Sequence, residues 1–86
     1  MLEFEDTETE PFPADGGLLV PLIRMTAGGL PSVDIKVGDQ QFRYDRSYPY
    51  KGQSAVMPAF LREQVAAGKK PLLVERPDRF YVYFAV

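Results

Sequence analysis

The chain has 86 residues and a formal net charge of −2, and it contains neither histidine nor cysteine. These two absences exclude Ser/His and Cys/His nucleophiles, disulfides and zinc sites of the usual kind. The length and a hydrophobic content of 45% predict one small folded domain, and no apolar run reaches the roughly 18 residues that span a bilayer. We therefore expect a cytoplasmic protein that is not embedded in a membrane, is not an enzyme, and uses no cofactor and no metal.

Residues 1–16 contain six carboxylates and no lysine or arginine, so residues 17–86 carry a net charge of +4. The segment also has two prolines and too little apolar surface to offset the entropy lost on ordering. We predict that residues 1–16 form a flexible acidic arm and that residues 17–86 form the folded domain. The acidic residues assigned to the arm are Glu3, Glu5, Asp6, Glu8 and Glu10.

The domain begins with an apolar segment, residues 18–25, that is typical of a strand. Because Pro21 has no N–H to donate to a ladder, we expect this strand at an edge of the sheet or at a bulge. Residues 33–44 then alternate apolar and polar side chains on either side of a Gly-Asp pair, which predicts a hairpin with a type II′ turn. The pairs expected across this hairpin are Ile35 with Phe42, Val33 with Tyr44, and Asp34 with Arg43.

Residues 45–54 are rich in turn-forming residues and predict a loop. We expect a helix over about residues 58–67, because Pro58 suits the first helical position and Gly68 supplies a left-handed stop. Ser54 is an alternative N-cap. The apolar side chains that share one face of this helix are Met57, Phe60, Leu61 and Val65.

Two strands close the chain, over residues 72–76 and 80–86. A two-residue loop between them would pair Glu75 with Phe80. Pro77 fits such tight turns poorly, so we favour a three-residue loop over residues 77–79. The pairs that this loop predicts are Val74 with Val82 and Leu72 with Phe84.

The predicted order is strand, strand, strand, helix, strand, strand, which indicates an α+β domain with a mainly antiparallel sheet and one short helix on one face. A strongly curled or barrel-like sheet is an alternative form. Residues 33–86 alone also fit a β-grasp order of two strands, a helix and two strands, an analogy that carries no function.

The segment of residues 43–53 interleaves aromatic rings with cations, a pattern that binds single-stranded nucleic acid or an acidic peptide. The simpler interpretation is that these tyrosines pack over the sheet edge while the charges are solvated. Two further pairs allow two interpretations: Tyr81 and Tyr83 dock a partner or are half-buried, and Lys69 and Lys70 contact an anion or offset the helix dipole. The candidate partner-binding residues are Arg43, Arg46, Tyr48, Tyr50, Lys51, Tyr81 and Tyr83.

These features predict a small regulatory, accessory or assembly protein that binds another protein, alone or within a larger complex. The acidic arm is expected to tune the interaction, either by attracting a basic partner or by folding back onto the cations of the domain. The alternative is a module that binds single-stranded nucleic acid through residues 43–53. The domain is only mildly basic, which makes a nucleic acid the second choice.

Overall fold

The computed structural model describes residues 2–4, 8–25, 33–49, 56–77 and 79–86. Within these residues the strands form one sheet in the order β1-β4-β5-β7-β6-β3-β2. In chain order the elements are β1 (Leu2–Phe4), β2 (Glu10–Pro13), the short 3-10 helix η1 (Asp15–Gly17), β3 (Leu19–Arg24), β4 (Ile35–Val37), β5 (Gln40–Pro49), α1 (Val56–Ala66), β6 (Pro71–Glu75) and β7 (Arg79–Ala85).

The sheet is mixed, which corrects the prediction of a mainly antiparallel sheet. β1 runs parallel to β4, and β3 runs parallel to β6, whereas the other neighbours are antiparallel. From residue 17 onward the elements follow the predicted order, but two strands precede them, so the strand order of the whole chain differs from the prediction. β5 lies between β4 and β7, so residues 33–86 do not have the β-grasp arrangement, in which the first and last strands are neighbours.

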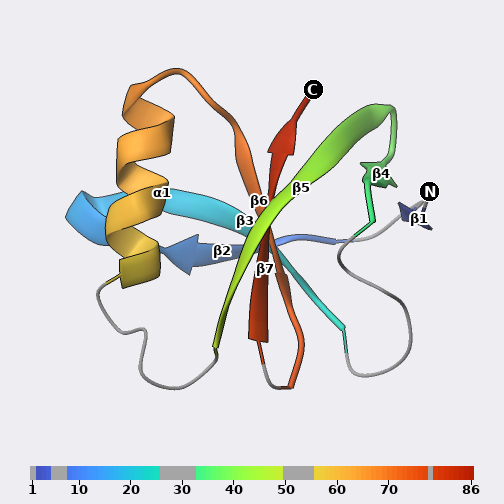
Figure 1. The fold of residues 1–86 in the computed structure, drawn as a ribbon, viewed down its shortest axis with the longest axis horizontal. Coiled ribbons are helices and arrows are strands. Elements are labelled where there is room, and N and C mark those ends of the chain that lie inside the picture. The colour runs from blue at the N-terminus through green and yellow to red at the C-terminus, as the bar shows by residue number, and fades with distance from the viewer. Residues whose placement is uncertain (1, 5–7, 26–32, 50–55, 78) are drawn as a thin grey trace.

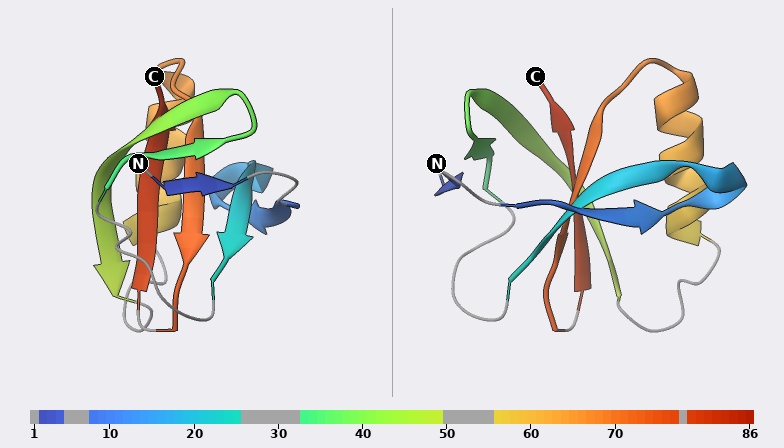
Figure 2. Two further views of the ribbon diagram at one scale, coloured as in Figure 1. Left: turned by 90° about the vertical axis from the view of Figure 1, so that its right-hand side faces the viewer. Right: turned by 180° about the vertical axis from the view of Figure 1, so that it is seen from behind.

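The sheet curls so that both of its faces are covered (Figures 1 and 2). α1 stands against one face, and the β1–β4 pair lies on the other side of the central strands. Burial on both faces explains why β6 and β7 read as nearly continuous apolar runs. The cluster beneath α1 contains Val20, Leu22, Met57, Leu61, Leu73, Phe80 and Val82. The cluster on the opposite face contains Ile23, Ile35, Leu72, Val74 and Tyr83.

The β4–β5 hairpin turns at Gly38, as predicted. Gly38 has a φ of 57°, the left-handed conformation that glycine adopts without strain, and Ile35 lies opposite Phe42. The ladder begins at Ile35, so the other two predicted pairs are wrong. Asp34 instead accepts a hydrogen bond from the backbone N–H of Tyr44 (3.2 Å), and Val33 precedes the strand.

The β6–β7 hairpin has the register that the sequence analysis rejected. Glu75 lies opposite Phe80 and Val74 lies opposite Tyr81, so the predicted three-residue loop is wrong. Each pair is shifted by one residue, which places Val74 and Val82 on opposite faces of the sheet. Because both faces are buried, neither register exposes an apolar face, and the residue pattern could not distinguish them.

β5 continues to Pro49, so the first half of the loop predicted for residues 45–54 is strand. Its register against β7 shifts between Tyr44 and Arg46, where Asp45 is an extra residue. This bulge reverses the alternation of side chains. Tyr44 packs in the cluster of the opposite face, whereas Tyr48 packs beneath α1. Residues 50–55 lie outside the described residues.

α1 begins at residue 56 rather than 58 and places Pro58 in its first turn, where backbone N–H groups have no partner within the helix. The helix ends in a Schellman motif. The N–H of Gly68 donates to the carbonyl of Val65 (2.9 Å), and the N–H of Lys69 donates to the carbonyl of Gln64 (3.0 Å). Gly68 has a φ of 88°, which confirms the predicted left-handed stop. The alternative N-cap, Ser54, lies outside the described residues.

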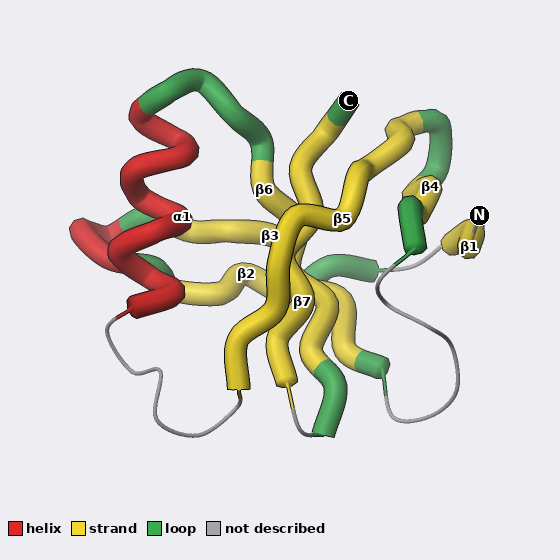
Figure 3. Tube along the Cα trace, viewed as in Figure 1, coloured by secondary structure: helices red, strands yellow, loops and turns green. Residues whose placement is uncertain are grey.

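The segment predicted as a flexible acidic arm contributes the two outermost strands of the sheet. β1 and β2 lie at opposite ends of the strand order, and Figure 3 shows them on different sides of the molecule. Phe12 of β2 packs against the ring of Phe80, with the ring centroids 5.5 Å apart. The described parts of residues 1–16 therefore share the sheet with the domain predicted for residues 17–86.

The register of β2 on β3 explains how two prolines fit into a four-residue strand. The N–H of Ala14 donates to the carbonyl of Leu18 (2.7 Å), and hydrogen-bonded pairs alternate along an antiparallel ladder. Pro11 faces Pro21 at a position that exchanges no hydrogen bonds, and Pro13 occupies the next such position. The outer edge of β2 therefore offers no N–H at either proline, which hinders the addition of another strand. β3 is paired on both sides, so it is not the edge strand that was predicted. Its pairing with β6 covers only Leu22–Arg24, however, and Pro21 itself has a ladder partner only in β2.

Candidate functional site

An apolar groove of about 360 Å³ opens where β3 and β6 diverge, near the end of α1. We call it the β3–β6 groove. Leu19 is the most conspicuous residue in it, because this large apolar side chain is 64% exposed. Its main lining residues are Leu19, Val20, Pro21, Val65, Lys70 and Pro71.

Two prolines cause the strands to part. The N–H of Met25 donates to the carbonyl of Glu75 (2.9 Å), which fixes the hydrogen-bond pattern of the parallel ladder. At the other end of the ladder, beyond the pair of Leu22 with Leu73, the next two hydrogen bonds would need the N–H groups of Pro21 and Pro71. Neither residue has one, so the ladder stops. The carbonyl groups of Leu19 and Pro71, which would accept those two bonds, are left without a donor from the ladder.

Two exposed cations, Lys69 and Lys70, line the groove, and a third, Arg43, lines the hollow beside it; we call these three residues the rim cations. Lys69 also lines a second hollow of about 260 Å³, which continues along β5 past Arg43 and Phe84. Among the residues that the structure describes, none of the rim cations lies within ion-pair distance of a carboxylate. The single acidic side chain in the lining of the second hollow, Asp45, is bound to Arg46 (2.5 Å).

Beside the second hollow, cations and aromatic rings form a continuous row. The guanidinium of Arg46 lies 4.0 Å from the ring centroid of Phe60, and the ammonium of Lys69 lies 5.5 Å from that of Phe84. The two phenylalanine rings meet edge to face at 6.0 Å, and Tyr48 adds a third ring at 6.1 Å from Phe60. Contacts of this kind attract a cation to the ring face and hold the long side chains in place. We call these five residues the cation–aromatic row.

The charge of Arg46 is secured by its neighbours. Its hydrogen bond to Asp45 raises the pKa of the Arg46 guanidinium. Partial desolvation of the guanidinium opposes this shift but does not cancel it. Because the pair with Asp45 neutralises much of this charge, Arg46 contributes mainly by ordering Phe60. The net positive charge of the site therefore comes from the three rim cations.

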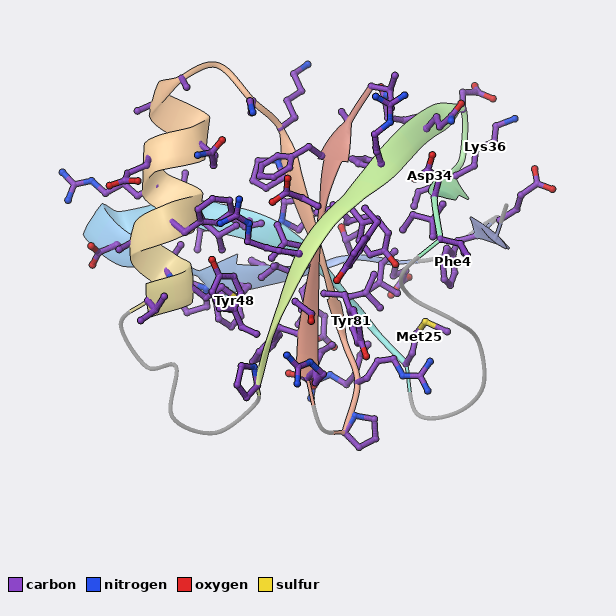
Figure 4. All side chains as sticks on the ribbon, in the orientation of Figure 1. Phe4, Met25, Asp34, Lys36, Tyr48 and Tyr81 are labelled. Atoms are coloured by element: carbon purple, nitrogen blue, oxygen red, sulfur yellow. The ribbon has the colours of Figure 1, made fainter. Side chains whose placement is uncertain are left out.

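The structure brings together three of the predicted partner-binding residues. Arg43, Arg46 and Tyr48 lie along β5 on the side of the sheet that α1 covers, where Figure 4 places Tyr48 beside the helix. Tyr50 and Lys51, also predicted for this site, lie outside the described residues.

The predicted tyrosine pair of β7 does not form an exposed surface. Tyr83 is 0% exposed, and Tyr81 is half-buried. Both rings pack with Tyr44, at centroid distances of 5.6 Å for Tyr83 and 6.3 Å for Tyr81. The Tyr83 hydroxyl has no hydrogen-bond partner among the described residues. Burial, reinforced by Tyr44, Tyr81 and the carboxylate of Asp34, raises the pKa of this hydroxyl.

The acidic residues of the N-terminal segment lie away from the groove or pair with other cations. Glu10 binds Arg24 (2.9 Å), and Asp15 approaches Arg62 (3.9 Å), so this part of the segment does fold back onto cations of the domain. These contacts are exposed and each contributes little to stability. Glu3 and Glu8 are exposed, whereas Glu5 and Asp6 lie outside the described residues.

The arrangement is suited to binding. Over the described parts of the chain, no three acidic, histidine or cysteine side chains come together as a metal site would require. Across the same residues, no helix has both the length and the apolar character needed to cross a bilayer. The groove offers apolar walls, two backbone acceptors and a cationic border.

Sequence reasoning missed Phe60, Phe84 and the groove itself. The sequence places Phe60 on the apolar face of the helix and Phe84 in the last strand, and both pack, partly buried, against the cluster beneath α1. The signal for the groove was the pair Pro21 and Pro71, but its meaning depends on knowing that β3 and β6 are parallel neighbours. Lys69 was noted as a possible anion contact, and its place between the two hollows is consistent with that interpretation.

No protein-family model matches this chain, and comparisons with curated proteins and with solved structures gave no match.

Proposed function

We propose that this protein is a small, non-catalytic accessory or regulatory protein that binds an acidic segment of another protein at the β3–β6 groove. The observation that carries the proposal is an apolar groove lined by Lys69 and Lys70, with Arg43 in the adjoining hollow. Among the described residues, none of these three cations lies within ion-pair distance of a carboxylate. Apolar contact supplies most of the affinity in such interfaces, while charge complementarity selects the partner and speeds its association.

A protein partner fits this site better than a single-stranded nucleic acid. Proteins that bind single strands need aromatic faces on which bases can stack. Here Arg46 covers a face of Phe60 at 4.0 Å, and Lys69 lies over Phe84 at 5.5 Å, so the protein's own cations compete for these faces. The border also holds few cations for the neutralisation of a phosphate backbone.

The acidic N-terminal segment is suited to tuning this interaction. Glu10 and Asp15 occupy Arg24 and Arg62, two exposed cations that lie outside the groove. An acidic partner therefore finds less attraction at those positions than at the rim cations. The segment would in this way direct an acidic partner toward the groove.

The test uses peptides selected from a random 12-residue display library against the full chain. Selected peptides should bind more weakly, by about tenfold, to an Arg43→Glu, Lys69→Glu variant. A Lys36→Glu variant is the matched control, because Figure 4 places Lys36 on the side of the molecule away from α1. Failure to enrich any peptide, or tight binding of the oligonucleotide (dT)12 that Arg43→Glu abolishes, would refute the proposal.

A further inference from the structure

We infer that the partner segment binds in an extended form, with bulky apolar side chains in the β3–β6 groove and acidic side chains on the rim cations. This inference rests on the proposed function and specifies the chemistry of the segment. Three properties of the groove carry it: its size, its two backbone acceptors that have no donor from the ladder, and the placement of its charges.

The size of the groove limits what enters it. A volume of about 360 Å³ is at the lower end for sites that bind small ligands and admits roughly one or two bulky side chains. A whole helix would need a longer trough. The exposed Leu19, together with Val65 and Pro71, provides the apolar contact surface.

The backbone of the groove indicates a polypeptide rather than a lipid. Pro21 and Pro71 remove the two N–H groups that would bond the carbonyl oxygens of Pro71 and Leu19, respectively. These acceptors need donors from a ligand or from water. An extended peptide brings backbone N–H groups at intervals along its length, whereas a fatty acid brings none.

The charges indicate acidic residues that flank the apolar ones. Lys69 lines both hollows, Lys70 lines the groove, and Arg43 lines the second hollow, so the positive charge lies around the apolar surface instead of within it. A segment with apolar residues between acidic ones complements this pattern. Its carboxylates would remain partly solvated, so that the desolvation cost stays small.

The test compares two variants that each place a carboxylate at an exposed apolar position. Leu19→Asp puts the charge in the groove, and Val56→Asp puts it at the start of α1; the native side chains are 64% and 60% exposed. Against the selected peptides we expect Leu19→Asp to weaken binding at least tenfold and Val56→Asp by less than twofold. Thermal unfolding followed by circular dichroism establishes that both variants fold.

The sequences of the selected peptides give a second readout. We expect them to be enriched in Leu, Ile or Phe with neighbouring Asp or Glu, and a Lys69→Glu, Lys70→Glu variant should bind them at least tenfold more weakly. Peptides that bind wild type but are insensitive to Leu19→Asp would overturn the inference and leave the proposed function standing. An empty selection would overturn both. Decanoate that binds more tightly than any selected peptide would show that the groove takes a lipid and would also overturn the inference.

Discussion

Replacing Tyr83 by phenylalanine is expected to raise the free energy of unfolding, although the tyrosine is completely buried. The Tyr83 side chain is 0% exposed, and its hydroxyl has no hydrogen-bond partner among the described residues. In the unfolded chain the same hydroxyl bonds to water. Folding therefore removes a polar group from water, and none of the described residues replaces its hydrogen bond.

The two opposing contributions can be compared. An unsatisfied buried hydroxyl costs about 1–3 kcal/mol, and Tyr83→Phe removes this cost. The substitution leaves a void about the size of one oxygen atom, roughly 10 Å³, which at about 24 cal/mol per Å³ costs only some tenths of a kcal/mol. We expect a net gain of about 1 kcal/mol, or a rise in Tm of about 4–8 °C for a domain of this size.

Urea unfolding followed by far-ultraviolet circular dichroism measures the difference. Tyr44→Phe is the matched control, because Tyr44 packs edge to face on Tyr83 but is only half-buried. Folding therefore desolvates its hydroxyl at a smaller free-energy cost. A Tyr83→Phe protein that is less stable than wild type by 1 kcal/mol or more would refute the reasoning, since it would mean that the hydroxyl is well satisfied.

Three further predictions concern pH, a helix end and a sheet edge. Above pH 10 the free energy of unfolding should fall by up to about 1.4 kcal/mol per pH unit, because the pKa of Tyr83 is raised in the folded state and the unfolded chain loses its proton first. Urea unfolding at pH 9–11 measures this decrease, which should be smaller in Tyr83→Phe. Gly68→Ala should lower the free energy of unfolding by about 1–2 kcal/mol. The cost is conformational, because the φ of Gly68 is 88° and no described atom lies within 4 Å of the added methyl group. A change below about 0.3 kcal/mol in thermal melts would contradict this prediction. A Pro11→Thr, Pro13→Thr variant restores two outward N–H groups on β2 and should associate at high concentration in sedimentation experiments, whereas a strictly monomeric variant would show that the prolines do not protect this edge.

Local signals in the sequence were sufficient for the elements that local geometry controls. The turn at Gly38 and the pair of Ile35 with Phe42 followed from alternation and turn chemistry, and the helix end followed from Gly68. Each of these features depends on residues close together in the chain. They could therefore be predicted without knowing the neighbours in space.

The errors concern features that distant segments decide. The register of β6 on β7 depends on burial against α1 on one face and against β4 on the other, and the apolar pattern alone permitted both choices. The strand β2 has two prolines, and it can form because its register on β3 places both of them at positions that exchange no hydrogen bonds. The bulge at Asp45, which determines that Arg46 and Tyr48 share a side with α1, has no glycine or other clear signal in the sequence.

The candidate site was predictable only in part for the same reason. The pattern of residues 43–53 identified Arg43, Arg46 and Tyr48, which do lie along one strand. The groove beside them depends on Pro21 and Pro71, which become neighbours only when two distant segments pair in parallel. The residues around each proline do not indicate that the two prolines together interrupt the ladder between β3 and β6.

The parallel pairing of β3 with β6 also has a consequence for how the molecule assembles. The β2–β3, β4–β5 and β6–β7 hairpins each join segments that are close in the chain, so they close their loops at little entropic cost. Leu22 and Leu73 must instead meet across most of the polypeptide, a long-range step that is slow to nucleate. The groove exists only after this step, so the partner proposed above would recognise the finished molecule but not a partly assembled one.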